Sequence, residues 1–430
     1  MLYFVAMTIP AYLSSQGGPE LDLGDGELAA LFIEALSKLG PRRRVLALPP
    51  DGTRAHARAG VLLKAAYEYY GGALKAVMPA LGTHKPMDEA EIRAMFPGLP
   101  PAIFVPHRWR SDIVELGRVP AEFVRRVSEG LCDFDWPAQV NRLVLEGGFD
   151  LVLSLGQVVP HEVVGMANYS KNLFVGVGGK DGIDRSHWLG AAYGIERVLG
   201  RVDTPVRAVL DYAQERFAAS IPIVYALTVV EALPGGASAT RGLFVGGGRE
   251  AFTRAAALSA RVNVKLTGEA AKTVVCYLDP AEFRSTWLGN KAIYRARLAM
   301  ADGGRLIVLA PGVGAFGEDP RIDATIRRHG YRGAARAAEL VASGELAGDL
   351  AGAAHLAHGS AEGRFSVIYA AGGLSRDEIE SVGYEYGDPR ELMRRYAPAA
   401  LADGWNERGG ERFYFIRNPA LGLWSDKIIS

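Results

Sequence analysis

The sequence contains very little cysteine and carries no net charge. Only Cys132 and Cys276 occur in 430 residues, far apart and outside any CxxC spacing, which argues against a disulfide framework or a thiolate zinc site. A reducing cytoplasm is the expected location. The 48 basic and 48 acidic residues cancel, so no overall field attracts nucleic acid or an anionic membrane. A small-molecule partner fits this balance better.

Long apolar runs and two common enzyme motifs are also missing. The apolar start MLYFVAMTIPAYL lacks a basic region and is interrupted by Pro10 before it reaches the length of a membrane span, so we interpret it as a first strand. The motif HExxH is absent, because Gly165 stands where the second histidine would be. No GxGxxG follows the first strand, which disfavours an NAD-dependent dehydrogenase.

The length and the composition predict two folded domains. A chain of 430 residues exceeds what one hydrophobic core normally supports. Its 49% hydrophobic and 22% charged residues are typical of a globular protein. We place the boundary near Val262, which gives an N-terminal domain of residues 1–262 and a C-terminal domain of residues 263–430 that closes over the substrate.

Strand-like and helix-like segments alternate in both predicted domains. This alternation predicts an α/β fold, with two largely parallel sheets flanked by helices and an active site in the crevice between the domains. The N-terminal strands are expected in RRVLALPP, LKAVMPAL, AIFVP and DLVLSLG, with a helix over WPAQVNRLVLEGG before the last of them. A hairpin is expected from IPIVYALTVV and TRGLFVGGG, and further strands in KTVVCYLD, GRLIVLAPG, RFSVIYAAGG and ERFYFIRNP.

Polar, titratable residues follow four of the predicted N-terminal strands. They are Asp51 with Thr53 and Arg54, then His84, then His107, then His161. Because ligands of such sheets bind beyond the carboxyl ends of the strands, we expect these side chains to face one crevice. His355 and His358 lie three apart on an Ala-rich helix with no carboxylate nearby, and we interpret them as packing or surface residues.

The stretch from Leu151 to Gly190 gathers His161, Lys171 and His187 in a segment rich in glycine and serine. An imidazole accepts a proton or binds a metal near neutral pH. A lysine whose ammonium is desolvated becomes a nucleophile that can hold a carbonyl-type group covalently. Proton transfer, covalent tethering and metal ligation are therefore all available in this stretch.

The order and spacing of these residues resemble a known family. The run GQVVPHEVVGMANYSKNLFVGVGG, with ten residues from His161 to Lys171 and sixteen more to His187, resembles the nickel-pincer nucleotide-dependent lactate racemases and their superfamily of 2-hydroxyacid racemases and epimerases. The upstream DGTR and GTHKP segments and the isolated His107 fit the same family in the same order. The resemblance covers most of the chain and is strongest from about Val45 to Gly190.

The resemblance implies a nickel cofactor that other proteins must make. Lys171 would carry the pyridinium-3-thioamide-5-thiocarboxylic acid mononucleotide that holds Ni(II), and His187 would supply the remaining nickel ligand. Asp51, Thr53 and His84 would lie around the cofactor. Cofactor biosynthesis proteins are then implied partners.

The same resemblance implies the reaction and the residues that handle the substrate. His107 and His161 would act as acid and base on opposite sides of a 2-hydroxyacid, while its hydrogen leaves as hydride and returns through a 2-oxo acid. Arg54 would bind the carboxylate. Tyr294 and Arg295 would line the substrate pocket from the helix NKAIYRARLAM.

Two departures from the family pattern leave the substrate open. The relatives carry a GFSGG-type run where this chain has GMANYS from Gly165 to Ser170. A glutamine after the tyrosine and a lysine three positions later are replaced here by Arg295 and Leu298. We therefore predict a 2-hydroxyacid without choosing among lactate, an aldonate or an aromatic acid.

Two alternative functions remain. The first is a hydrolase or lyase in which His84, His107 and His161 bind zinc. The second is a carrier of the nickel nucleotide, which needs Lys171 and His187 but neither acid/base histidine.

Overall fold

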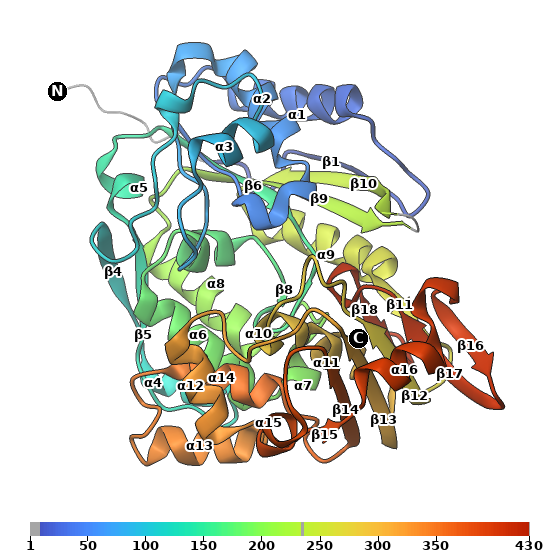
Figure 1. Ribbon diagram of the computed structural model, residues 1–430. Helices are drawn as coiled ribbons and strands as arrows, with labels where there is room; N and C mark the ends of the chain where they lie inside the picture. Colours follow the sequence, from blue (N-terminus) through green and yellow to red (C-terminus); the bar gives the residue numbers. More distant parts are fainter. Residues whose placement is uncertain (1–8, 234–235, 430) are drawn as a thin grey trace. The chain divides into compact units, whose positions relative to one another are not determined.

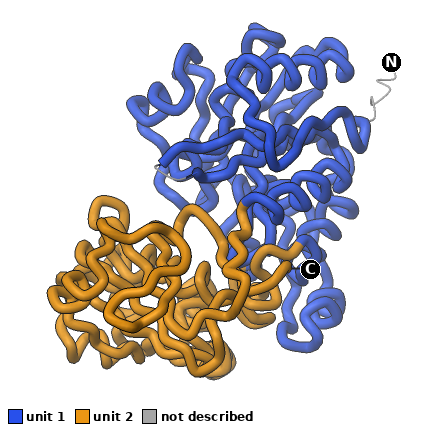
Figure 2. The backbone as a smooth tube through the Cα atoms, turned by 90° about the vertical axis from the view of Figure 1, so that its right-hand side faces the viewer, with its two compact units in different colours: residues 1–186, 202–262 blue, residues 187–201, 263–430 orange. Residues whose placement is uncertain are grey.

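The computed structural model describes residues 9–233 and 236–429, and their internal contacts divide the chain into two compact units. The first unit contains residues 1–186 and 202–262, and the second contains residues 187–201 and 263–430 (Figure 2). Residues 187–201, which the sequence-based division left in the N-terminal part, therefore group with the second unit. Most of the predicted first strand, MLYFVAMT, lies outside the described residues.

The first unit is built on a six-stranded mixed sheet with the strand order β1-β10-β9-β6-β2-β3. Strands β3, β2, β6 and β9 are parallel, and β9, β10 and β1 are antiparallel. The pairing of β9 with β10 confirms the predicted hairpin. The strands are β1 (Ser14–Gly17), β2 (Val45–Leu48), β3 (Leu74–Val77), β6 (Leu151–Gln157), β9 (Ile223–Ala232) and β10 (Ser238–Gly246).

Helices and smaller elements surround this sheet (Figure 1). Two antiparallel pairs lie outside it, β4 (Ile113–Val119) with β5 (Trp136–Asn141) and β7 (Pro160–His161) with β8 (Gly165–Met166). The helices are α1 (Asp25–Leu39), α2 (Ala59–Tyr70), α3 (Glu89–Met95), α4 (Ala121–Val127), α5 (Arg142–Glu146), α8 (Pro205–Phe217) and α9 (Arg249–Asn263). Short 3-10 segments are η1 (Gly52–Ala57), η2 (Gly71–Ala73) and η3 (Pro101–Ile103), and η4 (Asn172–Gly176) is a π-helical turn.

The core of the first unit lies where α1 and α2 pack on the sheet. Leu28, Phe32 and Leu36 recur at helical spacing on one face of α1 and are fully buried, as the pattern GELAALFIEALSKLG predicts. Every residue of β6 is buried, which is typical of a parallel strand covered on both faces.

Two segments differ from the sequence-based expectation. AIFVP does not form a strand, because the prolines at 100 and 101 begin the single turn η3, and only Phe104 makes a parallel bridge, to Val77. WPAQVNRLVLEGG is not one helix, because Trp136–Asn141 pairs with β4 as β5 and only Arg142–Glu146 is helical.

The second unit is built on a six-stranded sheet with the order β15-β14-β13-β12-β17-β16, parallel except for the β16–β17 pair. The two sheets confirm the predicted α/β class. The strands are β12 (Ala271–Tyr277), β13 (Met300–Ala310), β14 (Phe365–Ala371), β15 (Glu385–Tyr386), β16 (Gly404–Arg408) and β17 (Glu411–Ile416), with β11 (Val264–Leu266) and β18 (Leu423–Ser425) paired separately.

Between Asp319 and His358, where the sequence predicts two Ala-rich helices, the second unit has three helices, of which the last two are Ala-rich. The helices are α7 (Ile195–Val198), α10 (Thr286–Gly289), α11 (Lys291–Ala296), α12 (Pro320–His329), α13 (Ala334–Ala342), α14 (Leu350–His358), α15 (Arg376–Ser381) and α16 (Pro389–Tyr396), with single turns η6 (Pro398–Ala400) and η7 (Pro419–Leu421). Helix α6 (Lys180–Tyr193) begins in the first unit and ends in the second. In the described part of the chain, no helix combines the length and the apolar character that a bilayer crossing requires.

Candidate active site

The candidate site lies at the carboxyl end of the first sheet, where the direction of strand connection reverses. The chain passes from β2 to its neighbour β3, returns to the other side of β2 as β6, and continues outward to β9. Ligands of α/β sheets bind at such a switch point. The loops that follow β2 and β6 therefore border the expected binding position.

A π-helical turn holds Lys171 at this switch point. The turn η4 begins at Asn172, directly after Lys171, and single π-helical turns are frequent at functional sites. The amide of Asn172 donates to the Leu48 carbonyl (3.2 Å) and to the Ser154 hydroxyl (2.8 Å), on the adjacent strands β2 and β6. These two bonds fix the backbone at Lys171 beside the paired strands β2 and β6.

The amine of Lys171 is less basic than an ordinary lysine. Burial, assisted by the positive charges of Arg54 and Arg207 and opposed by Glu162 and Asp51, lowers the pKa of Lys171 to about 8. Roughly a tenth of the amine is therefore unprotonated at pH 7, and the unprotonated amine is the form that acts as a nucleophile.

The loop after β2 brings three of the predicted residues together. Both carboxylate oxygens of buried Asp51 are engaged, because Oδ1 accepts from the backbone N–H (3.2 Å) and the hydroxyl (2.5 Å) of Thr53, and Oδ2 accepts from Nδ1 of His84 (2.7 Å). Burial raises the pKa of Asp51, but these hydrogen bonds outweigh burial and the pKa lies below its ordinary value. Asp51 is therefore an ionised residue that orients Thr53 and the exposed His84.

His161 is buried in the short β7–β8 hairpin that leads toward Lys171. It pairs with Gly165, and Nδ1 of its ring accepts the backbone N–H of Val163 at 3.1 Å. A ring nitrogen that accepts a hydrogen bond has no proton, so the neutral imidazole carries its proton on Nε2. His161 is thereby set to donate a proton or a hydrogen bond through Nε2.

His107 is fully buried, and both of its ring nitrogens are hydrogen-bonded within the first unit. Nε2 donates to the carbonyl of Gly178 (3.0 Å), and Nδ1 accepts from the amide of Asn141 (3.0 Å). The amide orientation is fixed because Asn141 Oδ1 accepts from the backbone N–H of Leu143 at the start of α5. Burial lowers the pKa of His107, although the Gly178 carbonyl opposes the shift.

We expect Asn141→Asp to favour a proton on both ring nitrogens of His107. The aspartate still caps Leu143, but it presents a carboxylate to Nδ1 in place of an N–H. The pKa of His107 should rise by about 1–3 units, because a nearby negative charge favours imidazolium. A histidine ¹⁵N NMR titration measures this shift, with the neutral cap variant Asn141→Ser as the control. An unchanged titration in Asn141→Asp would contradict the bonding described above.

Three predicted residues belong to the second unit. His187 is the first residue of that unit and lies within α6. Tyr294 and Arg295 lie on α11 and are both buried, Tyr294 in a cluster with Leu199, Val264 and others. Their placement relative to Lys171 and the two acid/base histidines stays a prediction.

The second histidine pair is part of the packing of the second unit, as predicted. His355 stacks on Trp287 with 3.9 Å between ring centroids, and its Nε2 lies 3.1 Å from the hydroxyl of Tyr331. Burial lowers the pKa of His355 to about 3, so this ring is neutral. His358 is also buried, with its ring 6.4 Å from that of Tyr294.

The described residues do not form a metal site made of protein ligands alone. Nowhere in residues 9–233 and 236–429 do three histidine, cysteine, aspartate or glutamate side chains meet in an arrangement suited to a metal ion. His84, His107 and His161 therefore do not form the zinc site of the first alternative function.

Two features at this edge of the first sheet fit a covalently held nucleotide, one at Lys171 and one at the end of β6. The amine of Lys171 is available as a nucleophile, as described above. Gln157, the last residue of β6, is buried, and none of the described residues donates a hydrogen bond to its side-chain oxygen. A buried acceptor without a donor has a marked preference for a ligand that brings one, and ribose hydroxyls are such donors.

Replacing Lys171 with methionine should stabilise the protein below pH 8. There both the folded and the unfolded wild-type chains are protonated, and only the folded chain bears the cost of burying an ammonium. From pH 8 to 10.5 the unfolded chain binds more protons, so wild-type stability rises with pH. Lys171→Met should be more stable by up to about 3 kcal/mol at pH 7, with a smaller difference at pH 10.

Urea denaturation at both pH values measures this difference. Lys180→Met, which removes a partly exposed lysine paired with Asp184, is the matched control. An equal difference between wild type and Lys171→Met at pH 7 and pH 10 would show that the amine is not desolvated.

Sequence reasoning missed Asn141, Gln157, Asn172 and Arg207. Asn141 stood inside a predicted helix, although an asparagine ahead of RLVLE is typical of a helix N-cap. Asn172 directly follows Lys171, and Gln157 lies four residues before His161. Neither residue belongs to a sequence pattern that marks it as functional. Arg207 lies on an amphipathic helix, where nothing in the sequence separates it from a surface arginine.

The run GMANYS stands where the racemases that the sequence resembles carry a GFSGG-type run. Counted from Gly165, the last two glycines of GFSGG fall on Asn168 and Tyr169. These two residues have positive φ values of 70° and 57°, a conformation that glycine adopts easily and other residues seldom do. The backbone conformation that the glycines favour is therefore present here without them.

The fold is shared with solved structures. A protein from Thermotoga maritima matches with a TM-score of 0.76 and 24% sequence identity, over 93% of this chain and 100% of its own. The lactate racemase apoprotein from Thermoanaerobacterium thermosaccharolyticum matches with a TM-score of 0.70 and 13% identity, over 94% of this chain and 93% of its own. At these identities the similarity establishes the fold. No family model and no curated protein matches the sequence.

Proposed function

We propose that this protein is a racemase or epimerase of 2-hydroxyacids that uses a nickel-pincer nucleotide attached to Lys171. The observation that carries the proposal is the lysine at the switch point: its amine has a pKa of about 8, and the next residue, Asn172, is hydrogen-bonded to both β2 and β6. The lactate racemase fold and the order of His107, His161, Lys171 and His187 in the sequence support it.

The residues of the chain would divide the work around that nucleotide. Lys171 would hold it covalently, His187 would bind its nickel, and Asp51 would orient Thr53 and His84 beside it. When bound, the nucleotide supplies a hydride acceptor, which avoids forming a carbanion next to a carboxylate.

The protein itself would bind the substrate and manage the proton of its hydroxyl group. Arg54, whose charge already acts on Lys171, suits the substrate carboxylate, because guanidinium forms two parallel hydrogen bonds to it. His161 would hold the proton at the hydroxyl oxygen through Nε2. His107 would take the corresponding role for the other enantiomer after giving up its bond to Gly178. Tyr294 and Arg295 would contribute to the choice of 2-hydroxyacid.

A test uses protein that is produced together with the cofactor-making proteins. D-lactate, L-lactate, an aldonate and an aromatic 2-hydroxyacid are each incubated with it, and the products are separated by chiral chromatography. Inversion of at least one acid is the expected result. Inactivity on all four acids, with a covalent adduct present, would overturn the proposed racemase function.

A second candidate is a non-catalytic carrier of the same nucleotide. One observation favours it: the ring of His107 is engaged at both nitrogens and fully buried. A carrier would show the adduct on Lys171 without inversion of any substrate, and it would release the nucleotide to a second protein. The same preparation therefore separates the two functions.

A further inference from the structure

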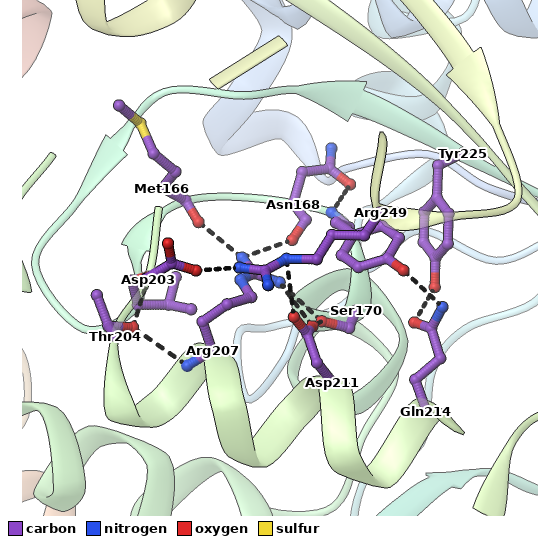
Figure 3. A network of polar contacts seen from close by, with 12 residues as sticks. Met166, Asn168, Ser170, Asp203, Thr204, Arg207, Asp211, Gln214, Tyr225 and Arg249 are labelled. Carbon is purple, nitrogen blue, oxygen red and sulfur yellow. Dashed lines mark hydrogen bonds and ion pairs between the residues drawn. The ribbon is translucent and has the colours of Figure 1, made fainter. Parts of the chain in front are cut away.

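A buried arginine contacts the backbone that leads into Lys171. Arg207 stands in the first turn of α8, and its guanidinium points at the segment 166–170 (Figure 3). Nη2 donates to the carbonyls of Met166 (2.8 Å) and Asn168 (3.1 Å), and Nη1 donates to the hydroxyl of Ser170 (2.7 Å). One side chain thus binds three of the five residues that precede Lys171.

The segment that Arg207 binds is conformationally strained. Asn168 and Tyr169 both have left-handed φ values, and two successive non-glycine residues in this region need support from their surroundings. Support comes from the Arg207 bonds and from the Tyr169 ring, which packs 4.6 Å from Tyr225 and 5.3 Å from Phe252, measured between centroids.

The charge of Arg207 is balanced by a second layer of partners. Asp211, one turn further along α8, accepts from the Ser170 hydroxyl at 2.7 Å and lies 3.9 Å from Nη1 of Arg207. Nε of Arg249 lies 3.3 Å from the other Asp211 oxygen, and Arg249 also pairs with Asp203 (Figure 3). The guanidinium carbon of Arg207 lies 4.3 Å from the centroid of the Phe252 ring.

The position of Arg207 is unfavourable for an arginine unless these partners are present. A cation in the first turn opposes the helix dipole, and a fully buried guanidinium loses its hydration. Burial accordingly lowers the pKa of Arg207 to about 10, although Asp211 opposes the shift. An apolar side chain would fill the same space without these penalties. The hydrogen bonds of Arg207 to residues 166–170 therefore indicate the role that favours an arginine here.

We propose that Arg207 is a positioning residue for Lys171: its hydrogen bonds hold the segment 166–170, with its left-handed turn at Asn168 and Tyr169, in the conformation that places the lysine amine in its desolvated position. The inference rests on the proposed function only for the identity of what Lys171 binds. It predicts that the titration midpoint of the Lys171 amine rises when the hydrogen bonds of residue 207 are lost, even if the positive charge at that position is kept.

The test is an NMR titration of ¹³C-labelled lysine in the apoprotein, with the Lys171 signal assigned through Lys171→Arg. Arg207→Lys keeps the charge but cannot bind three acceptors in a fixed plane. Its Lys171 midpoint should rise by at least about one pH unit toward the ordinary lysine value, which lowers the free-amine fraction about tenfold at pH 7. Arg207→Gln should raise the midpoint at least as much.

Two further variants separate positioning from general structural support. Arg241→Lys removes another partly buried arginine of the same unit, bound to Glu231 and to the Leu21 carbonyl, and should leave the midpoint unchanged. Adding Asn168→Gly to Arg207→Lys should restore much of the wild-type midpoint, because glycine adopts the left-handed conformation without support.

An unchanged midpoint in both Arg207 variants would overturn the proposal. So would a midpoint that rises in Arg207→Gln but stays at the wild-type value in Arg207→Lys, because charge alone would then explain it. If the Arg207 variants do not fold, Ser170→Ala, which removes one of the three acceptors, is titrated instead. A raised Lys171 midpoint supports the proposal and an unchanged one overturns it. Because the readout needs no cofactor, a missing adduct in wild-type holoprotein would count against the proposed function and leave this result standing.

Discussion

Lys171→Arg protein, produced together with the cofactor-making proteins, is expected to have only the mass of the unmodified chain. Wild-type protein should carry the additional mass of the nucleotide. Arginine keeps the positive charge and nearly the length of lysine, but its guanidinium stays protonated and is not a nucleophile. Inversion of 2-hydroxyacids should fall to the uncatalysed background, because no cofactor is then held at the switch point.

Intact-mass measurement and a peptide map of residues 165–180 check this expectation. Lys180→Arg is the matched control, because Lys180 lies nine residues further along and is partly exposed and paired with Asp184. It should keep both the adduct and the activity. An adduct that persists in Lys171→Arg would mean that another nucleophile carries the nucleotide, and the assignment of Lys171 would be wrong.

The second large effect is expected from His161→Gln, which should lower turnover about 10²–10⁴-fold while the adduct persists. Glutamine offers an amide hydrogen but no transferable proton, and proton transfer by a positioned side chain contributes an effect of about this size. The hairpin should remain intact, because the glutamine carbonyl can accept the Val163 N–H that His161 Nδ1 accepts now.

Turnover from each enantiomer, measured at saturating substrate, checks this expectation together with the intact mass. His329→Gln, a histidine on α12 of the second unit, is the control and should leave both quantities unchanged. Full activity in His161→Gln would exclude His161 as the residue that handles the hydroxyl proton.

The parts of the fold that the sequence predicts well are those set by short-range patterns. The mainly apolar run LVLSLG became the buried strand β6, and the helical period of GELAALFIEALSKLG became α1 with its apolar face on the sheet. WPAQVN was predicted wrongly because its strand conformation depends on pairing with Ile113–Val119, whose residues lie 17 to 28 positions before their partners. Pairing of this kind leaves no local pattern.

The candidate site divides in the same way. Asp51, Thr53 and His84 were expected together because each follows a strand of one parallel sheet, and the structure joins them by hydrogen bonds. Asn141 could not be foreseen as the partner of His107, because 34 residues separate them. The sequence also gave no sign that Arg207 would support the residues before Lys171.

The sequence by itself determined the α/β class, the order of the chemically active residues and the absence of a cysteine-based site, because each follows from residue type and local spacing. Only the tertiary structure decided the protonation behaviour of those residues. The pKa of Lys171, the tautomer of His107 and the left-handed turn at Asn168 and Tyr169 depend on burial and on groups distant in sequence, such as Arg207, 37 residues from Ser170. Electrostatic and hydrogen-bond energies depend on distance in space, and the folded chain alone sets that distance.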